Sequence, residues 1–235
     1  MSPFTPASRK IGPNAARLSP ACDLESAEIG PTLRAISELQ AKGFDLPDQT
    51  AMREYRLGRI VQHLQNRNLG GILLFDPVNI RYATDSMNMQ VWTMHNLARA
   101  AFVSCEGYVI LWDFTHCEHM TTHLPLINEV RHGAGAFYFE HGDKTEKIAR
   151  KFARDVISVM AEHGLGLPLA VDRMDVSVAK GFDDIGISYI AGQPVMEHAR
   201  LIKGPDEILA MKCAASACEA AVGEMHKTLA PGLAE

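Results

Sequence analysis

The stretch Gly70–Pro77, which reads GGILLFDP, decides the fold of this 235-residue chain. Its central residues, 72–75, are all apolar, and they lie between a Gly-Gly pair and an Asp-Pro pair, both of which break regular structure. An uninterrupted apolar run of this length is typical of a strand buried on both faces. The sequence therefore predicts a central strand covered by helices.

Further helix and strand signals lie on both sides of this strand. They predict a helix around 32–41, a helix through 57–64, an antiparallel hairpin of strands 100–104 and 108–112, a helix from 143 to 163 capped by Asp143, a strand over 169–171, and short helix and strand segments near 176–181 and 188–190. Their alternation is typical of a three-layer α/β domain. We expect this domain, with a mixed sheet, to span residues 48–196.

Composition limits the classes of function. Hydrophobic residues make up 47% of the chain, enough for a substantial core, and a net charge of −5 with interspersed signs offers no basic surface for nucleic acid. No stretch has the length and apolar character of a membrane span, and residues 1–8 contain no apolar leader. We expect a cytoplasmic protein that binds neither nucleic acid nor membrane. Five cysteines without a C-x-x-C pair favour reduced thiols: Cys22, Cys105, Cys117, Cys213 and Cys218.

The two ends of the chain differ from this domain. Residues 1–47 contain repeated prolines and form an expected N-terminal arm, which could wrap a partner subunit or be disordered. Near the other end, Pro205 followed by Asp206 and Glu207 predicts the start of a helix. Apolar or small residues then recur at alternating steps of three and four: Ile208, Met211, Ala215, Cys218, Val222, Met225 and Leu229. This stripe predicts a packing partner, which we expect to lie outside this chain, because only six residues follow Leu229. The alternatives are packing on its own domain or pairing as a short coiled coil.

Two segments resemble a known superfamily. Residues 75–85, FDPVNIRYATD, are similar to the Asp-Pro-x-Asn-Ile-x-Tyr-Leu-Thr-Gly element in N-terminal domains of the creatinase and prolidase superfamily. Residues 199–212, ARLIKGPDEILAMK, resemble the junction at which that domain enters the pita-bread metal domain. The resemblance implies a creatinase/prolidase N-terminal domain followed, over residues 197–235, by a linker and the first helix of a truncated pita-bread catalytic domain.

The sequence departs from the peptidases of this superfamily after Tyr82. Asp85 replaces the usual glycine, and residues 87–96 read MNMQVWTMHN. With these features the chain resembles the pita-bread lyases that split dimethylsulfoniopropionate into dimethyl sulfide and acrylate by β-elimination. The resemblance implies a metal-dependent carbon–sulfur lyase that is a homodimer when complete. It places the iron or zinc ligands beyond residue 235, so we expect this chain alone to be inactive.

The resemblance also suggests residues that contact the substrate. A sulfonium cation is attracted by an aromatic face. Trp92 and His95 are therefore the first candidates for substrate contact, followed by Tyr82, although aromatic residues beside apolar ones more often pack in a core. No catalytic residue and no metal ligand is expected in this chain. His116, His119 and His123 have the spacing of one helical face, for which a solvated surface is the default interpretation over a zinc site.

Two other functions remain open at this stage. One is a truncated prolidase or Xaa-Pro aminopeptidase, because the 75–85 and 199–212 segments occur in those enzymes as well. The other is a non-catalytic interaction module that dimerises through the predicted helix at 205–229.

Overall fold

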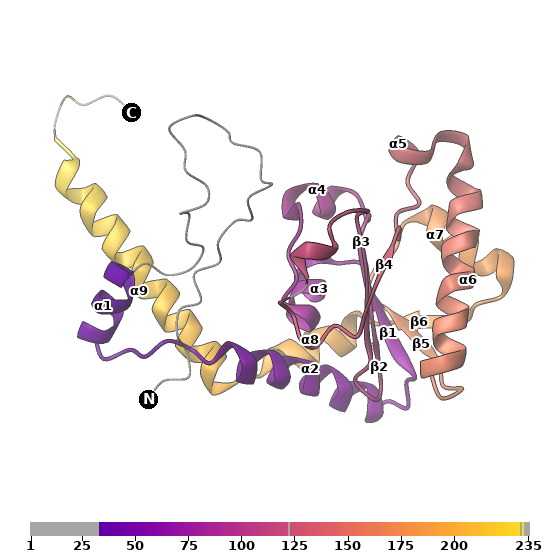
Figure 1. Cartoon of the computed structure of the whole chain (residues 1–235), viewed down its shortest axis with the longest axis horizontal. Coiled ribbons are helices and arrows are strands. Elements are labelled where there is room, and N and C mark those ends of the chain that lie inside the picture. Colours follow the sequence, from indigo (N-terminus) through magenta and orange to yellow (C-terminus); the bar gives the residue numbers. More distant parts are fainter. Residues whose placement is uncertain (1–32, 122, 231, 233–235) are drawn as a thin grey trace. The chain divides into compact units, whose positions relative to one another are not determined.

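The computed structural model describes residues 33–121, 123–230 and 232 (Figure 1). The chain divides into a compact unit formed by Arg53–Ile202 and a second unit that combines the residues before Arg53 with those from Lys203 onward. Residues 1–32 of the predicted arm, with Cys22, lie outside the described residues. The predicted division into 1–47, 48–196 and 197–235 stays a prediction.

A mixed six-stranded sheet forms the centre of the Arg53–Ile202 unit, as predicted, with the strand order β4-β3-β2-β1-β5-β6. Its strands are β1 (Gly71–Leu74), β2 (Ala100–Ser104), β3 (Val109–Asp113), β4 (Glu129–His132), β5 (Leu169–Val171) and β6 (Tyr189–Ala191). β1 is antiparallel to β2 and parallel to β5, β2 is antiparallel to β3, and the pairs β3–β4 and β5–β6 are parallel. Among the described strands, β2 therefore alone runs opposite to the rest.

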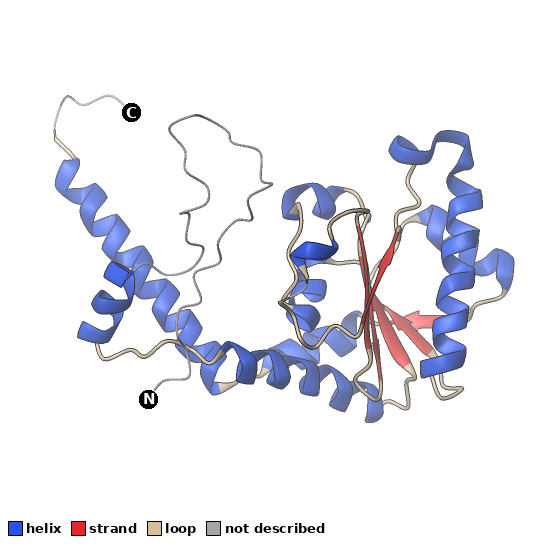
Figure 2. Cartoon of the chain, viewed as in Figure 1, coloured by secondary structure: helices blue, strands red, loops and turns tan. Residues whose placement is uncertain are grey.

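Helices cover both faces of the sheet, which confirms the three-layer α/β fold (Figure 2). One face packs against α2 (Gln49–Gln65), α3 (Pro77–Thr84) and α8 (Gln193–Leu201), and the other against α6 (Thr145–His163) and α7 (Val176–Ile185). All four residues of β1 are buried because they lie between these two layers. The apolar run that predicted a central strand is thus the centre of the sheet.

Phe152 of α6 joins the aromatic part of the core. Its ring centroid lies 5.9 Å from that of Phe75, 5.5 Å from that of Trp112 and 6.4 Å from that of Phe182. Phe152 is only 3% exposed. These contacts fasten α6 to β1, β3 and α7.

Several expectations about local structure need correction. Asp143 does not cap α6, because it lies in the short 3₁₀ helix η3 (Gly142–Lys144), and the Thr145 hydroxyl donates to Gly142 O. The histidines at 116–123 do not share an α-helical face, because, of the described residues in this stretch, Glu118–Met120 alone is helical, as the 3₁₀ segment η2. Among the described α-helices and strands, five were not predicted: α3, α4 (Gln90–His95), β4, α5 (Tyr138–His141) and α8.

The second unit contains α1 (Leu33–Ala41) and α9 (Pro205–Thr228). The predicted start of α9 is confirmed, and Glu207 Oε2 accepts a hydrogen bond from Gly204 N at 3.0 Å. Lys42 Nζ, just after α1, donates to Ser216 Oγ of α9 at 2.7 Å. The predicted apolar stripe, which runs along α9 to Leu229 just after it, is exposed: Ile208, Met211, Ala215, Cys218, Val222, Met225 and Leu229.

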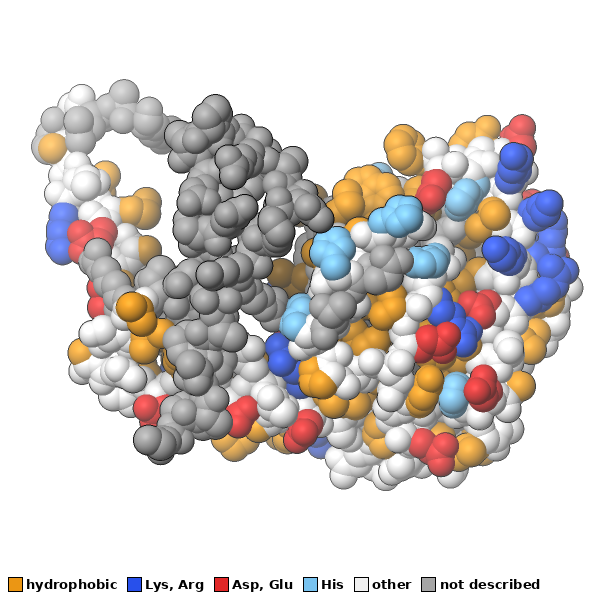
Figure 3. All heavy atoms as spheres, in the orientation of Figure 1, with side chains coloured by type: hydrophobic (Ala, Val, Ile, Leu, Met, Phe, Trp, Pro, Cys, Tyr) orange, Lys and Arg blue, Asp and Glu red, His pale blue; other side chains and the backbone are white. Residues whose placement is uncertain are grey.

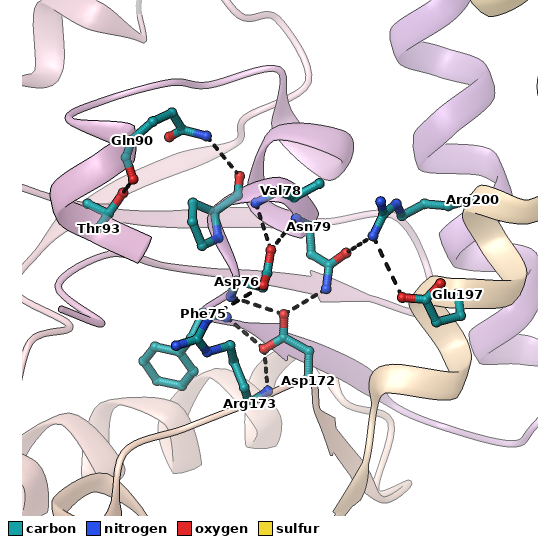
Figure 4. Close-up of polar contacts among 11 residues, drawn as sticks. Phe75, Asp76, Val78, Asn79, Gln90, Thr93, Asp172, Arg173, Glu197 and Arg200 are labelled. Carbon is teal, nitrogen blue, oxygen red and sulfur yellow. Dashed lines mark hydrogen bonds and ion pairs between the residues drawn. The ribbon is translucent and has the colours of Figure 1, made fainter. Parts of the chain in front are cut away.

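Asp172 ties together the ends of two central strands (Figure 4). Its carboxylate follows β5 and accepts hydrogen bonds from Phe75 N at 2.8 Å, Asp76 N at 3.1 Å and Asn79 Nδ2 at 3.0 Å. Burial raises the pKa of Asp172, while these hydrogen bonds and one from Arg173 N oppose that rise. The end of β1 and the start of α3 are thereby fixed to the end of β5.

We predict that Phe152→Ala lowers the free energy of unfolding by about 3–5 kcal/mol, because it removes a buried aromatic side chain and leaves a cavity. Urea unfolding of the purified chain measures this loss. Phe139→Ala is the matched control, since Phe139 is 84% exposed and its loss should change stability by less than about 0.5 kcal/mol. Equal effects of the two variants would contradict the described core.

We also predict a pH-dependent effect of Asp172→Asn. The pKa of Asp172 is raised on folding from its ordinary value of 3.8, so the folded chain binds this proton more tightly than the unfolded chain does. The stability advantage of the wild type over the variant should therefore be largest below pH 3.8 and fall as the pH rises through the raised pKa. Urea unfolding at a series of pH values measures it. An advantage that grows with pH would mean that the hydrogen bonds outweigh burial. The exposed control Asp183→Asn should change the free energy of unfolding by less than about 0.5 kcal/mol.

Candidate functional site

The carboxyl ends of five strands meet at one edge of the sheet, because all strands except β2 run in the same direction. In open α/β sheets, ligands bind at this edge where the following helices diverge to opposite faces. Here α3 leaves β1 toward one face and α7 leaves β5 toward the other. Polar residues gather at this edge: Asp76, Arg99, Asp113, His132 and Asp172.

Asn79 joins the two segments that carry the family resemblance (Figure 4). Asp76 caps α3, and its Oδ1 accepts hydrogen bonds from Val78 N at 2.8 Å and Asn79 N at 3.3 Å. The Asn79 side chain donates to Asp172 and accepts from Arg200 Nη1 at 3.1 Å. The 75–85 segment therefore holds helix α8 in place.

Tyr82 also contacts this helix. Its hydroxyl donates to Ala199 O at 3.0 Å, and the guanidinium carbon of Arg56 in α2 lies 5.5 Å from the centre of its ring. Both the polar atom and the ring of Tyr82 thus make contacts within the domain. These contacts give Tyr82 a structural role, and its contact with a substrate stays a prediction.

Trp92 and His95 share the short helix α4. The Trp92 ring packs against Phe114 at 5.7 Å and Phe137 at 5.5 Å between centroids, and it is partly exposed. His95 lies almost one turn further along α4 and is exposed. The structure therefore brings two of the three predicted contact residues together and places Tyr82 among other neighbours on α3.

The segment Asp85–Arg99, which contains α4, has several locally unfavourable features. Asp85 and Met89 have φ angles of 59° and 44°, a left-handed conformation that costs most non-glycine residues about 1–2 kcal/mol and an aspartate less. Within the described residues, Gln90 Oε1 and Arg99 Nη1 are the buried side-chain atoms without a hydrogen-bond partner. Strain and unpaired polar groups typically cluster at functional sites. This 85–99 segment is therefore our candidate site.

The outer surface of the 85–99 segment is apolar. Met89 is 58% exposed, Val91 85% and Met94 57%. Figure 3 shows hydrophobic and histidine side chains next to one another on one face of this unit. Contiguous exposed apolar groups typically mark a surface that contacts a ligand or another protein.

A cavity of about 570 Å³ lies beside the Trp92 cluster, at the ends of β3 and β4. Phe114, which touches the Trp92 ring, lines this cavity together with Asp113, His132, His141 and Lys151. The sequence analysis missed these residues. Of these residues, only Asp113 has a signal in the sequence. It comes at the end of an apolar strand, in the same way that Asp76 comes directly after β1.

The polar groups present do not fit a metal ion. Across residues 33–121, 123–230 and 232, no three His, Cys, Asp or Glu side chains are arranged to hold one. Asp113 is paired with Arg99 and Asp155 with Arg131, so these carboxylates already have cationic partners. We derive no metal-dependent step from these residues. None of the described helices has the length and apolar character required to cross a membrane.

Solved structures share this fold. A Xaa-Pro dipeptidase from Bacillus anthracis matches with a TM-score of 0.52 at 21% identity, covering 77% of this chain and 44% of that one. A prolidase from Pyrococcus horikoshii OT3 matches with a TM-score of 0.51 at 13% identity, covering 76% and 44%. At such low identity, these similarities show the fold alone.

Sequence comparison gives a nearer relationship. The chain is 45% identical over 205 residues to dimethylsulfoniopropionate lyase DddP from Roseovarius nubinhibens and 43% identical to that from Roseobacter denitrificans. Each match covers 87% of this chain and 46% of the relative, so the chain spans about half their length. No protein-family model matches the sequence. The predicted resemblance is nevertheless confirmed: over 87% of its length the chain is similar to dimethylsulfoniopropionate lyases DddP, and it has the fold of creatinase/prolidase N-terminal domains.

Proposed function

We propose that this chain is the N-terminal part of a metal-dependent lyase that cleaves dimethylsulfoniopropionate to dimethyl sulfide and acrylate. The supporting observation is the 45% identity to a lyase of that name over 87% of the chain. Since the chain corresponds to 46% of that relative, the proposal assigns the divalent metal, iron or zinc, and its ligands to the rest of the protein. It also includes a homodimer in the cytoplasm.

The proposed reaction is a β-elimination. A base removes a proton from the carbon next to the carboxylate, and the released electron pair forms the carbon–carbon double bond. The carbon–sulfur bond breaks, and its electrons leave with sulfur as neutral dimethyl sulfide. The base belongs, in this proposal, to the part of the protein that lies outside this chain.

Within this reaction, Trp92 would hold the cationic end of the substrate. Phe114 and Phe137 support its ring while part of the side chain stays accessible, as a contact with a sulfonium group requires. Sulfur loses its positive charge as the bond breaks, so this attraction is strongest before the reaction. Trp92 should therefore affect KM more than kcat. His95 follows on the same helix as the second candidate contact, and Tyr82 is the third.

Because the proposal places the base and the metal outside this chain, the chain alone and the complete protein should differ in activity. With iron or zinc, the 235-residue chain should release no dimethyl sulfide above a metal-only control, while the complete protein should release it with acrylate. Headspace gas chromatography measures the sulfide. Hydrolysis of a proline dipeptide by the complete protein, without release of dimethyl sulfide, would instead support a prolidase-like peptidase.

For Trp92→Ala in the complete protein, we predict a rise in KM of about 2- to 30-fold, the equivalent of a cation–π contact of 0.5–2 kcal/mol, with little change in kcat. Trp92→Phe should recover part of the loss, because it keeps an aromatic face. Val176→Ala, at a position that is 85% exposed on α7, is the control. An unchanged KM in Trp92→Ala would remove Trp92 from the substrate site.

A further inference from the structure

We infer that two ion pairs, Arg53–Asp85 and Arg99–Asp113, position the candidate substrate contacts by holding the 85–99 segment at both of its ends. This inference rests on the proposed function, because it treats Trp92 and His95 as substrate contacts. Arg53, Asp85, Arg99 and Asp113 would then be positioning residues that act through α4.

The first pair holds the start of the segment. Arg53 Nη2 lies 2.7 Å from Asp85 Oδ2, its Nε donates to the same oxygen at 2.8 Å, and the two side chains are 12% and 20% exposed. Asp85 ends α3 in a left-handed conformation that glycine adopts without strain. Compared with glycine, an aspartate adopts this conformation less easily, but its carboxylate forms an ion pair with Arg53 of α2. The link therefore offers a physical reason for aspartate at this position.

The second pair holds the end of the segment and also reaches back to its start. Arg99 and Asp113 are each 1% exposed, with Nε–Oδ1 and Nη2–Oδ2 distances of 2.9 and 2.8 Å. Arg99 Nη2 also donates to Ser86 Oγ at 2.6 Å, and Asn88 Nδ2 donates to Asp113 Oδ1 at 3.1 Å. Because Asp113 ends strand β3, the pair anchors both ends of the segment to the sheet.

The middle of the segment has little apolar packing of its own. Met89, Val91 and Met94 are largely exposed, and α4 is only six residues long. Such a short helix is not stable by itself. Its conformation therefore depends on the contacts of Trp92, on Leu97 in the core just after α4, and on polar contacts at the two ends. Side chains that bind a ligand need this kind of support from residues that do not touch the ligand.

Asp85→Gly tests the inference in the 235-residue chain. Glycine accepts the left-handed backbone, so the variant removes the ion pair without adding strain. We expect the ¹⁵N order parameters of backbone amides 86–98 to fall from about 0.85 to below about 0.6, while those of α6 stay unchanged. Asp85→Asn, which tolerates this backbone and keeps an acceptor for Arg53, should restore much of the order.

A matched control and a second variant complete this experiment. Asp184→Asn removes a more exposed ion pair, that with Arg150 at 2.8 Å, and should leave amides 86–98 ordered. The double variant Arg99→Met/Asp113→Leu removes both buried charges together, so that no lone charge stays buried. It should fold and still lose order over 86–98. Unchanged order parameters in Asp85→Gly and in the double variant would overturn the inference, whatever the activity of the enzyme.

Kinetics of the complete protein test the link to Trp92. Asp85→Gly should raise KM for dimethylsulfoniopropionate with little change in kcat, and Asp85→Gly/Trp92→Ala should have the same KM as Trp92→Ala alone. Additive effects in the double variant would overturn the positioning role. If Trp92→Ala itself leaves KM unchanged, the proposed role of Trp92 fails, while the order parameters still report separately on the two ion pairs.

Discussion

The edge of the sheet depends on the hydrogen bonds that the carboxylate of Asp172 accepts. A carboxylate that is even partly buried, as at Asp172, is costly unless donors surround it. Here the backbone N–H groups of Phe75 and Asp76 and the amide of Asn79 supply them. Those donors lie at the end of β1 and the start of α3. The hydrogen bonds that stabilise the carboxylate therefore also fix the direction in which α3 leaves the sheet. Asn79 then extends the same network to Arg200 in α8.

The fold could be predicted where apolar periodicity and chain breakers agree. The run in β1, the hairpin of β2 and β3, and the long helices α6 and α9 all carry such signals. β4 carries none, because it pairs with β3 alone and its residues are only partly buried. α4 has no side-chain cap and begins after a left-handed Met89, so nothing in its local sequence indicates a helix start.

The candidate site was less predictable, since its important contacts link distant residues. Trp92 and His95 were identified from a family resemblance, and no periodic pattern indicates them. The partners Arg53 and Asp85 are 32 residues apart, and Arg99 and Asp113 are 14 apart. A sequence shows charged residues but not which of them pair across elements. Asp85 gave a signal as a departure from the usual glycine, and Asp113 offered one as the end of an apolar strand, but neither signal indicates its partner.

The edge of the sheet thus contains two kinds of polar group. Those around Asp172 are largely engaged by other parts of the domain, so a ligand would have to displace existing hydrogen bonds to use them. Those in the 85–99 segment include unpaired atoms beside partly exposed aromatic and apolar side chains. The unpaired atoms are themselves buried, but a ligand can contact the exposed apolar side chains and the partly exposed Trp92 without first breaking the domain's own hydrogen bonds. The 85–99 segment therefore stays the proposed site of recognition, and the network around Asp172 keeps the neighbouring strands and helices fixed.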